Sequence, residues 1–105
     1  MTAKTGEDLR TLLARGQDAI RRGDFGAAAA SLEAALSLAP ADLRVLHTLA
    51  GVRHALGRHE DAAALLERAL ERAPDDPRLW FSLGLIRHAA GRYRAAGQAY
   101  ERALT

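Results

Sequence analysis

Histidines and acidic dipeptides are the side chains of this 105-residue sequence that could bind a metal or move protons. Imidazole is a common metal ligand, but His47 and His54 are two helical turns apart, about 10 Å along a helix axis, whereas zinc needs every ligand at about 2 Å. Glu60-Asp61 and Asp75-Asp76 fall at expected helix starts, where negative charge interacts favourably with the helix dipole. We therefore expect no metal site, and helix capping in place of acid–base catalysis.

Other catalytic motifs are missing from the sequence. The stretch Trp80-Phe81-Ser82-Leu83-Gly84 lacks the first glycine of a nucleophile elbow and falls inside an expected helix. The glycines recur singly and form no phosphate-binding loop. With no cysteine, disulfides and thiol nucleophiles are excluded. We expect a non-enzymatic protein without catalytic residues, metal or cofactor.

The composition limits the classes of partner that we expect for this protein. It is 49% hydrophobic and 27% charged, which is typical of a folded domain, and its few aromatic residues and many alanines favour helix. The net charge of +2 is too small to indicate nucleic acid binding. No run reaches the roughly 18 apolar residues of a membrane span, and the N-terminal residues lack the apolar core of a signal peptide. We expect no nucleic acid or membrane partner and a cytoplasmic protein.

The sequence contains an internal repeat. The segments Ala35–Pro40 and Ala69–Pro74 lie 34 residues apart, and the same spacing relates Gly23, Gly57 and Gly91. Apolar residues recur three and four apart on both sides of each glycine, which indicates two amphipathic helices per unit. We expect six helices, at 6–22, 25–38, 43–56, 59–73, 77–90 and 93–104.

Aspartates mark the expected helix starts. Asp24 and Asp42 can cap the second and third helices, and Asp76 the fifth, which opens with Pro77 at its first position. Thr5 with Asp8 forms a weaker capping-box variant for the first helix.

The repeat unit resembles the tetratricopeptide repeat, whose pattern runs Trp, Leu-Gly, Tyr, Ala, Phe, Ala and Pro. The matching residues are Leu12, Gly16, Ala28, Leu32, Ala35 and Pro40 in the first unit, Leu46, Leu49-Ala50, Ala62, Leu66, Ala69 and Pro74 in the second, and Trp80, Leu83-Gly84, Ala96, Tyr100 and Ala103 in the third. Arg87 stands where an aromatic residue is usual. Arg15 replaces the leucine of the first unit, which indicates an end helix that is less covered on one side.

The resemblance implies an all-α fold, a right-handed solenoid of three antiparallel helix hairpins. The polar residues 1–8 then form a lead-in, and 9–105 form a single domain with repeats at 9–42, 43–76 and 77–105. The function implied is that of a protein–protein interaction module.

In this family the first helix of each repeat lines a concave groove. Carried over to this chain, the groove residues are Arg10, Leu13, Gln17 and Ile20, then Arg44, His47, Gly51 and His54, then Arg78, Phe81, Leu85 and His88. The arginines are either solvated first-turn residues or a ladder of forked donors for carboxylates. With the second interpretation, the partner is an acidic peptide or helix. At the clamp positions by which some relatives hold chaperone tails, this chain has Leu13, Gln17, Thr48, Arg78 and Ser82, so we do not expect that partner.

An alternative to groove binding is a structural role as a fragment of a longer array, which self-associates through its end helices. Because no polar capping helix follows the sixth helix, copies could associate through it as a homo-oligomer. In that case Ala96, Ala99, Tyr100, Ala103 and Leu104 should be partly exposed.

Overall fold

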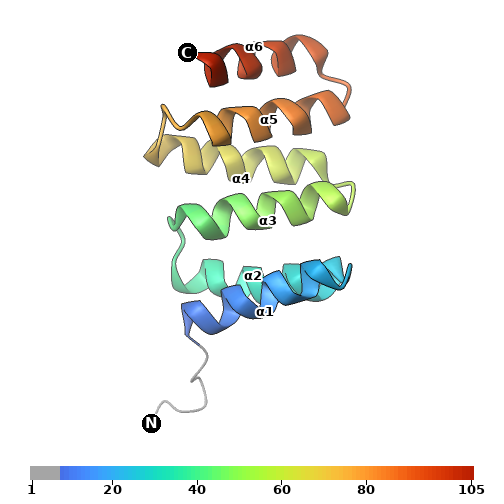
Figure 1. The fold of residues 1–105 in the computed structure, drawn as a ribbon, viewed down its shortest axis with the longest axis vertical. Coiled ribbons are helices and arrows are strands. Elements are labelled where there is room, and N and C mark those ends of the chain that lie inside the picture. Colours follow the sequence, from blue (N-terminus) through green and yellow to red (C-terminus); the bar gives the residue numbers. More distant parts are fainter. Residues whose placement is uncertain (1–7) are drawn as a thin grey trace.

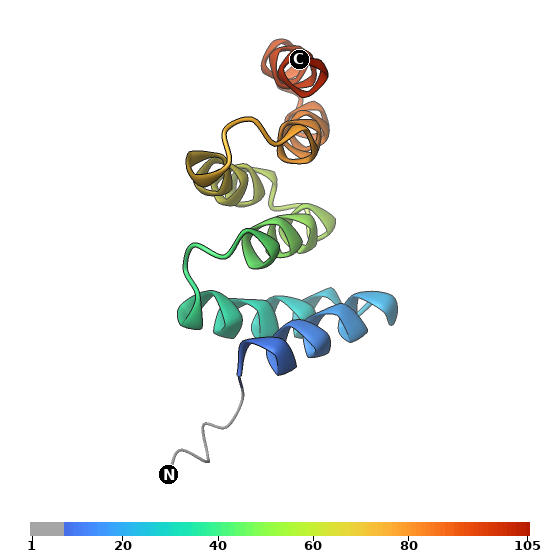
Figure 2. The same ribbon diagram turned by 60° about the vertical axis from the view of Figure 1, so that its left-hand side comes forward.

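The computed structural model describes residues 8–105 and contains six helices stacked in chain order (Figure 1). Their bounds are α1 Leu9–Arg21, α2 Phe25–Leu38, α3 Leu43–Ala55, α4 His59–Arg72, α5 Pro77–Ala89 and α6 Tyr93–Leu104. Within residues 8–105 there is no β-strand. The expected all-α solenoid of three helix hairpins is confirmed, and Figure 2 shows how successive hairpins turn along the stack.

Aspartate side chains start four of the six helices. Asp24, Asp42 and Asp76 accept hydrogen bonds from backbone N–H groups in the first turns of α2, α3 and α5, as expected. The expected start of the first helix at residue 6 is wrong, because Asp8 has extended backbone and its carboxylate accepts from Thr11 N at 2.9 Å. Helix α1 therefore begins at Leu9. Thr5, the other half of the expected cap, lies outside the described residues.

The helix ends follow from the turns between the helices of each hairpin. Gly23, Gly57 and Gly91 have φ of 78°, 81° and 81°, the left-handed region that favours glycine. The residue after each glycine donates its N–H back into the preceding helix, as in the 2.8 Å bond from Asp24 N to Ala19 O. Helices α1, α3, α4 and α5 each end one residue before the expected position.

A continuous core runs through the stack because small and large residues alternate at the repeat period. Ala28 and Ala62 are fully buried, and Ala96 is 2% exposed, so neighbouring helices approach closely there. Leu32, which lies against Gly16 of the same hairpin, and Leu66 are also fully buried. Every repeat thus depends on its neighbours for burial of its apolar face.

Ion pairs between neighbouring repeats follow the same period. Arg53 of α3 pairs with Glu33 of α2, and Arg87 of α5 pairs with Glu67 of α4, whose Nη2 and Oε2 atoms lie 2.9 Å apart. Residues 53 and 87, like residues 33 and 67, are 34 positions apart. The same contact therefore joins the first repeat to the second and the second to the third.

The two ends of the stack differ in polarity. Val45, Leu49 and Val52 of α3 are buried, but the corresponding residues of α1 are Thr11, Arg15 and Asp18, all of them exposed. The expectation that the first helix is less covered on one side is confirmed.

At the other end of the stack, the expected exposure of Ala96 and Ala99 is wrong. They are 2% and 1% exposed, because this face of α6 packs on α5. Tyr100 and Ala103 are half-buried, and Leu104 is 87% exposed, as expected for an end helix. No helix in the described part of the chain combines the length and hydrophobicity that crossing a bilayer requires.

Candidate functional site

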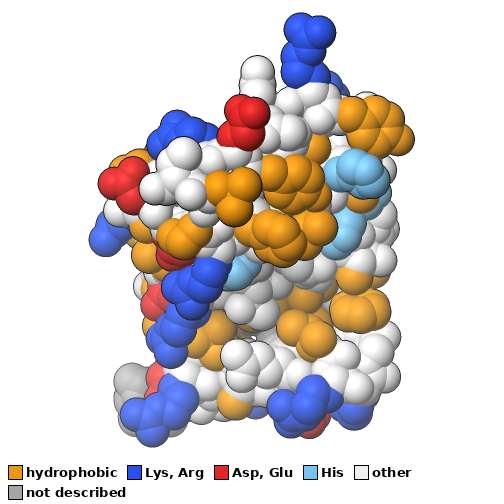
Figure 3. Space-filling model, turned by 45° about the horizontal axis from the view of Figure 1, so that its top comes forward, with side chains coloured by type: hydrophobic (Ala, Val, Ile, Leu, Met, Phe, Trp, Pro, Cys, Tyr) orange, Lys and Arg blue, Asp and Glu red, His pale blue; other side chains and the backbone are white. Residues whose placement is uncertain are grey.

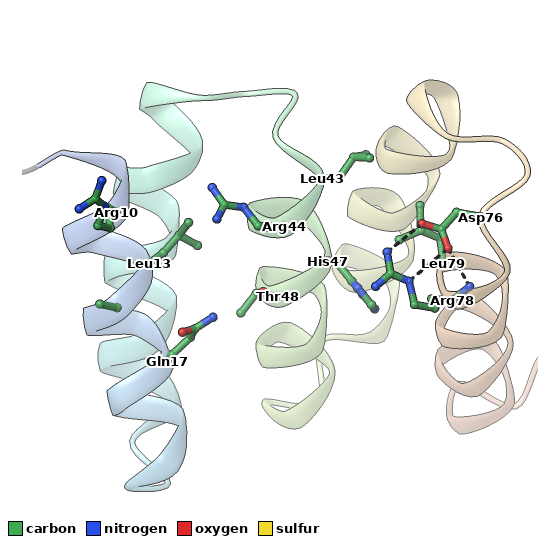
Figure 4. A pocket seen from close by; sticks show the side chains of 11 residues that line it. Arg10, Leu13, Gln17, Leu43, Arg44, His47, Thr48, Asp76, Arg78 and Leu79 are labelled. Carbon is green, nitrogen blue, oxygen red and sulfur yellow. Dashed lines mark hydrogen bonds and ion pairs between the residues drawn. The ribbon is translucent and has the colours of Figure 1, made fainter.

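The first helices of the three repeats enclose an open hollow on one face of the stack. Its volume is about 340 Å³, and Figure 4 shows its side chains converging from α1, α3 and α5. The lining residues are Arg10, Leu13, Ala14, Gln17, Leu43, Arg44, His47, Thr48, Asp76, Arg78 and Leu79. Six of these residues belong to the stripe expected from the sequence: Arg10, Leu13, Gln17, Arg44, His47 and Arg78.

Two of the three arginines are oriented by the aspartate that caps their own helix. Arg78 donates from Nε and Nη2 to Asp76 at 3.4 and 3.3 Å, and Arg44 Nη2 lies 3.6 Å from Asp42. Both guanidinium groups stay in solvent, since the Arg44 and Arg78 side chains are 71% and 81% exposed. Arg44 extends from α3 toward α1, and Arg78 extends from α5 toward α3 (Figure 4). The interpretation of these arginines as solvated first-turn residues therefore remains compatible with the structure.

The charge of this hollow is positive. It is lined by three arginines and one aspartate, a formal excess of two positive charges. The hydrogen bonds that Arg78 donates hold the pKa of the Asp76 carboxyl below its usual range, so this aspartate is ionised at neutral pH. The field in the hollow thus favours an anionic ligand.

His47 and Ser82 form a hydrogen bond across the floor of the groove, with His47 Nε2 and Ser82 Oγ 2.8 Å apart. Burial lowers the pKa of His47, and the nearby Arg78 lowers it further, while Asp76 acts in the opposite direction. His47 is therefore neutral at pH 7.

This pair has the spacing of a base and a nucleophile, but its surroundings do not suit acyl transfer. Ser82 lies in the middle of α5, where the backbone N–H groups are used by helix hydrogen bonds and cannot stabilise an oxyanion. Among the described residues, no carboxylate accepts a hydrogen bond from His47. The pair therefore fixes the two helices relative to each other.

Apolar side chains lie beside the charged hollow, toward the C-terminal end of the groove. Phe81 and Leu85 are 51% and 46% exposed. Leu85 lines a small hollow of about 150 Å³ with His47 and His54, and Phe81 lies beside Leu104. Figure 3 shows apolar side chains gathered next to histidines in the upper half of this view. This part of the groove can bury apolar groups of a ligand.

Two residues of the expected stripe have other contacts. Ile20 is half-buried against the core of the first repeat. The His88 ring lies edge-on to Tyr93, with ring centroids 5.1 Å apart. Both residues lie at the far end of the first helices, away from Arg10, Arg44 and Arg78.

Some lining residues lie outside the stripe expected from the family: Ala14, Leu43, Thr48, Asp76 and Leu79. Of these, Thr48 was named only as a clamp position. The stripe expected from the family contains one residue per helical turn. The hollow is also lined by residues that neighbour this stripe. Helical spacing would have indicated Ala14 and Thr48, which follow Leu13 and His47 directly. The sequence indicates Asp76 only as a helix cap, but in the structure its second carboxylate oxygen also accepts a hydrogen bond from Arg78.

The four histidines do not all come together. Residues 8–105 contain no cluster of three or more histidine, aspartate or glutamate side chains arranged to hold a metal ion. One pair was not anticipated: His54 Nδ1 and His59 Nδ1 lie 3.2 Å apart across the turn between α3 and α4. This distance fits a hydrogen bond between one protonated and one unprotonated nitrogen.

Comparisons with known proteins agree with this architecture. Two family models described as tetratricopeptide repeat match residues 19–84 and 77–105. No curated protein sequence matches the chain.

Solved structures with the same fold include the Sgt2 TPR domain from Aspergillus fumigatus, at 34% identity and a TM-score of 0.85, covering 90% of this chain and 63% of that one. The globular C-terminal domain of LpoP from P. aeruginosa is 32% identical with a TM-score of 0.86, covering 94% and 97% of the two chains. The second TPR of Spaghetti (RPAP3), bound to the HSP90 peptide SRMEEVD, has a TM-score of 0.85 at 16% identity over 96% and 94% of the chains. The chain thus spans less than two thirds of the Sgt2 domain. It belongs to the tetratricopeptide repeat family, whose helical solenoids are protein–protein interaction modules.

Proposed function

We propose that the protein is a non-enzymatic module that binds an acidic segment of a partner protein in the groove formed by α1, α3 and α5. The observation that carries this proposal is the convergence of Arg10, Arg44 and Arg78, one from each repeat, on a single hollow. Arginine is suited to this role because its planar guanidinium can bind a carboxylate through two parallel hydrogen bonds.

The spacing of the arginines favours an extended or helical ligand over a small molecule. Each arginine comes from a different first helix, and even directly packed helices lie about 8–10 Å apart, so a ligand must span several residues to meet all three. Exposed ion pairs contribute only about 0–1 kcal/mol each. Charge alone therefore gives weak binding.

Apolar contacts supply the rest of the affinity in this proposal. Phe81 and Leu85 are half exposed beside the arginines, and an apolar side chain of the ligand can bury both. The preferred ligand thus combines carboxylates with a bulky apolar residue. The peptide SRMEEVD in the Spaghetti structure is such an acidic ligand on a similar fold. Because this chain has leucine, glutamine and threonine at Leu13, Gln17 and Thr48, we do not extend that partner to it.

The test is a binding titration with two short fluorescent peptides. One alternates glutamate with leucine, and the other has glutamine in place of every glutamate. We expect the acidic peptide to bind in a saturable way and the neutral peptide to bind at least about tenfold more weakly, the effect of losing roughly 1.4 kcal/mol. The groove variant replaces three arginines by glutamine: Arg10, Arg44 and Arg78.

The matched control makes the same charge change at three exposed arginines that do not line the hollow: Arg21, Arg58 and Arg72. It should bind the acidic peptide like the parent, whereas the groove variant should not. Equal binding of both peptides by the parent, or equal loss in the groove and control variants, would rule out a specific acidic site. Absence of saturable binding of the acidic peptide would overturn the proposal as well.

A further inference from the structure

A stripe of apolar residues runs along α6 beside the face that packs on α5, and one member, Tyr100, is half-buried against Gly84 of α5. Its members are spaced four, three and four residues apart, which places them on one face of a helix: Tyr93, Gly97, Tyr100 and Leu104. Tyr93 and Leu104 are 65% and 87% exposed. At Gly97 an added Cβ would meet nothing within 4 Å, so the middle of the stripe is open.

The equivalent residues of the inner repeats are covered. Leu66 corresponds to Tyr100 and is fully buried, and Leu70 corresponds to Leu104 and is 7% exposed. Helix α5 covers these leucines of α4, whereas α6 is the last helix of the stack (Figures 1 and 2). The stripe on α6 is thus a stacking face of the same kind, without a helix on it in the described part of the chain.

Stacking of copies head to tail does not suit this face. The helix that would then meet α6 is α1 of another copy. Its corresponding positions hold Thr11, Arg15 and Asp18, where α3 and α5 have buried aliphatic residues. Polar side chains there would lose water without gaining apolar contacts.

The face is instead complementary to itself. Arg94 and Glu101 flank the stripe at its opposite ends, one helical heptad apart on the same side. Within residues 8–105 neither side chain forms an ion pair. When two such helices run antiparallel, the arginine of each lies next to the glutamate of the other, the arrangement by which flanking charges set orientation in helix pairs.

We propose that α6 pairs with α6 of a second copy in an antiparallel, two-fold symmetric contact. In this arrangement Leu104 packs on Tyr93 of the second copy, and the part of the Tyr100 ring that α5 leaves uncovered lies at the open space of its Gly97. Arg94 pairs with Glu101 of the second copy, and this ion pair occurs twice in the dimer because a two-fold contact repeats every interaction. The proposal does not depend on the ligand of the groove.

The contact is small, so the dimer is reversible. Each copy contributes one face of a helix of 12 residues. The surface that this face can bury is smaller than the about 800 Å² per partner of a standard stable interface. We therefore expect monomer at low micromolar and dimer at submillimolar protein concentration.

The test measures the dissociation constant by sedimentation equilibrium for the parent and for charge-swap variants. Arg94→Glu places an acid in the first turn of α6 and Glu101→Arg places a base in its last turn, so both changes favour the helix dipole and keep the helix folded. Each single change places two like charges next to each other at both symmetry-related positions of the dimer. We therefore expect at least about a tenfold weaker association. The double variant Arg94→Glu/Glu101→Arg restores opposite charges and should dimerise like the parent.

The control is Asp18→Arg, which makes the same charge change as Glu101→Arg at an exposed site on α1, at the other end of the stack, and should leave dimerisation unchanged. Circular dichroism checks that every variant keeps its helices. A parent protein that stays monomeric at submillimolar concentration overturns the proposal. So does a parent dimer in which the single swaps do not weaken association, or in which the double variant fails to recover, because the contact would then lie elsewhere.

Discussion

Gly84 of α5 lies directly against the ring of Tyr100 of α6. A Cβ placed on Gly84 would come within 2.5 Å of Tyr100 Cε1 and 2.6 Å of Cδ1, closer than real Cβ contacts allow. The corresponding contact in the first repeat is between Gly16 and Leu32 Cγ, at 2.9 Å. Residues 16 and 84 thus lack a side chain because the second helix of the hairpin occupies that space.

This contact makes Gly84→Ala a destabilising change, although alanine is the better helix former. The propensity gain is about 1 kcal/mol, but overpacking a close contact costs about 1–3 kcal/mol, and the Tyr100 ring must also leave its place beside Phe81. We expect a net loss of about 1 kcal/mol in the free energy of unfolding, measured with urea. Gly51→Ala is the control, because a Cβ there meets nothing within 4 Å. It should stabilise the protein by about 0.5–1 kcal/mol, and equal effects of the two substitutions would contradict the packing argument.

Helices α4 and α6 begin without a side-chain cap, which offers a stabilising substitution. Arg58 precedes α4 with φ −96° and ψ 70°, nearly the conformation of Asp24 before α2, at φ −92° and ψ 78°. Asp24 accepts from Ala27 N at 3.0 Å. Arg58→Asp should therefore cap α4 and stabilise the protein by about 1 kcal/mol.

The control for this cap is Arg58→Ala, which removes the exposed ion pair with Asp61 and adds no cap. It should change stability by less than about 0.5 kcal/mol. Thermal melts of the three proteins decide the matter. If the aspartate and alanine variants melt together, the unfilled cap does not limit the stability of α4.

The lowered pKa of His47 links the fold to pH. Because burial and Arg78 depress the folded-state pKa, the unfolded chain binds more protons than the folded protein as pH falls below the unfolded value of about 6.5. The contribution of neutral His47 is thus fully present above this value and is lost as pH falls from it toward the folded-state pKa. Asp76 stays ionised in this range because its own pKa is lowered from 3.8.

Urea denaturation at pH 7.5 and pH 5.5 measures this link. We expect His47→Gln, which can keep a hydrogen bond with Ser82, to lose less stability between these two pH values than the parent does. Gln17→Ala changes another residue of the hollow without removing a titratable group, and should keep the pH dependence of the parent. A parent-like pH dependence in His47→Gln would show that another group causes it.

The fold could be predicted from the sequence because each repeat carries the same small residues and turn glycines. Once Gly23 and Gly57 marked the period, the helices followed with ends within a few residues. The wrong predictions concern features that the spacing of residues in the sequence does not determine. One example is which of two polar residues caps α1. Ala96 and Ala99 were expected on the free face of α6, but they are the small residues that let α6 approach α5.

The groove was harder to predict than the fold. The arginine of each repeat was located correctly on a first helix, but its pairing with the aspartate two positions earlier depends on side-chain rotamers. The hydrogen bond between His47 and Ser82 joins residues 35 positions apart on different helices. The contact of His54 with His59 depends on the geometry of the turn at Gly57. A periodic pattern predicts on which face of a helix a residue lies, but it does not predict which side chain that residue contacts.

Salt dependence should separate the two kinds of contact in the proposed groove. Exposed charges are screened over about 8 Å at physiological ionic strength, so the part of the affinity that comes from Arg44 and Arg78 weakens as salt is added. Burial of apolar surface at Phe81 is not screened. We expect binding of the glutamate–leucine peptide to weaken with salt and to level off at a nonzero affinity.

Two variants test which residues provide the salt-dependent and the salt-independent part of the affinity. Arg44→Gln should bind more weakly than the parent at low salt and converge with it at high salt, because it removes only the screened interaction. Phe81→Ala should weaken binding by about 1–2 kcal/mol at every salt concentration and keep the salt dependence of the parent. Fluorescence anisotropy titrations from low to high salt measure both slopes. If Phe81→Ala changes the slope and Arg44→Gln does not, the assignment of charge and apolar contact within the groove is wrong, because an aromatic side chain carries no net charge for salt to screen.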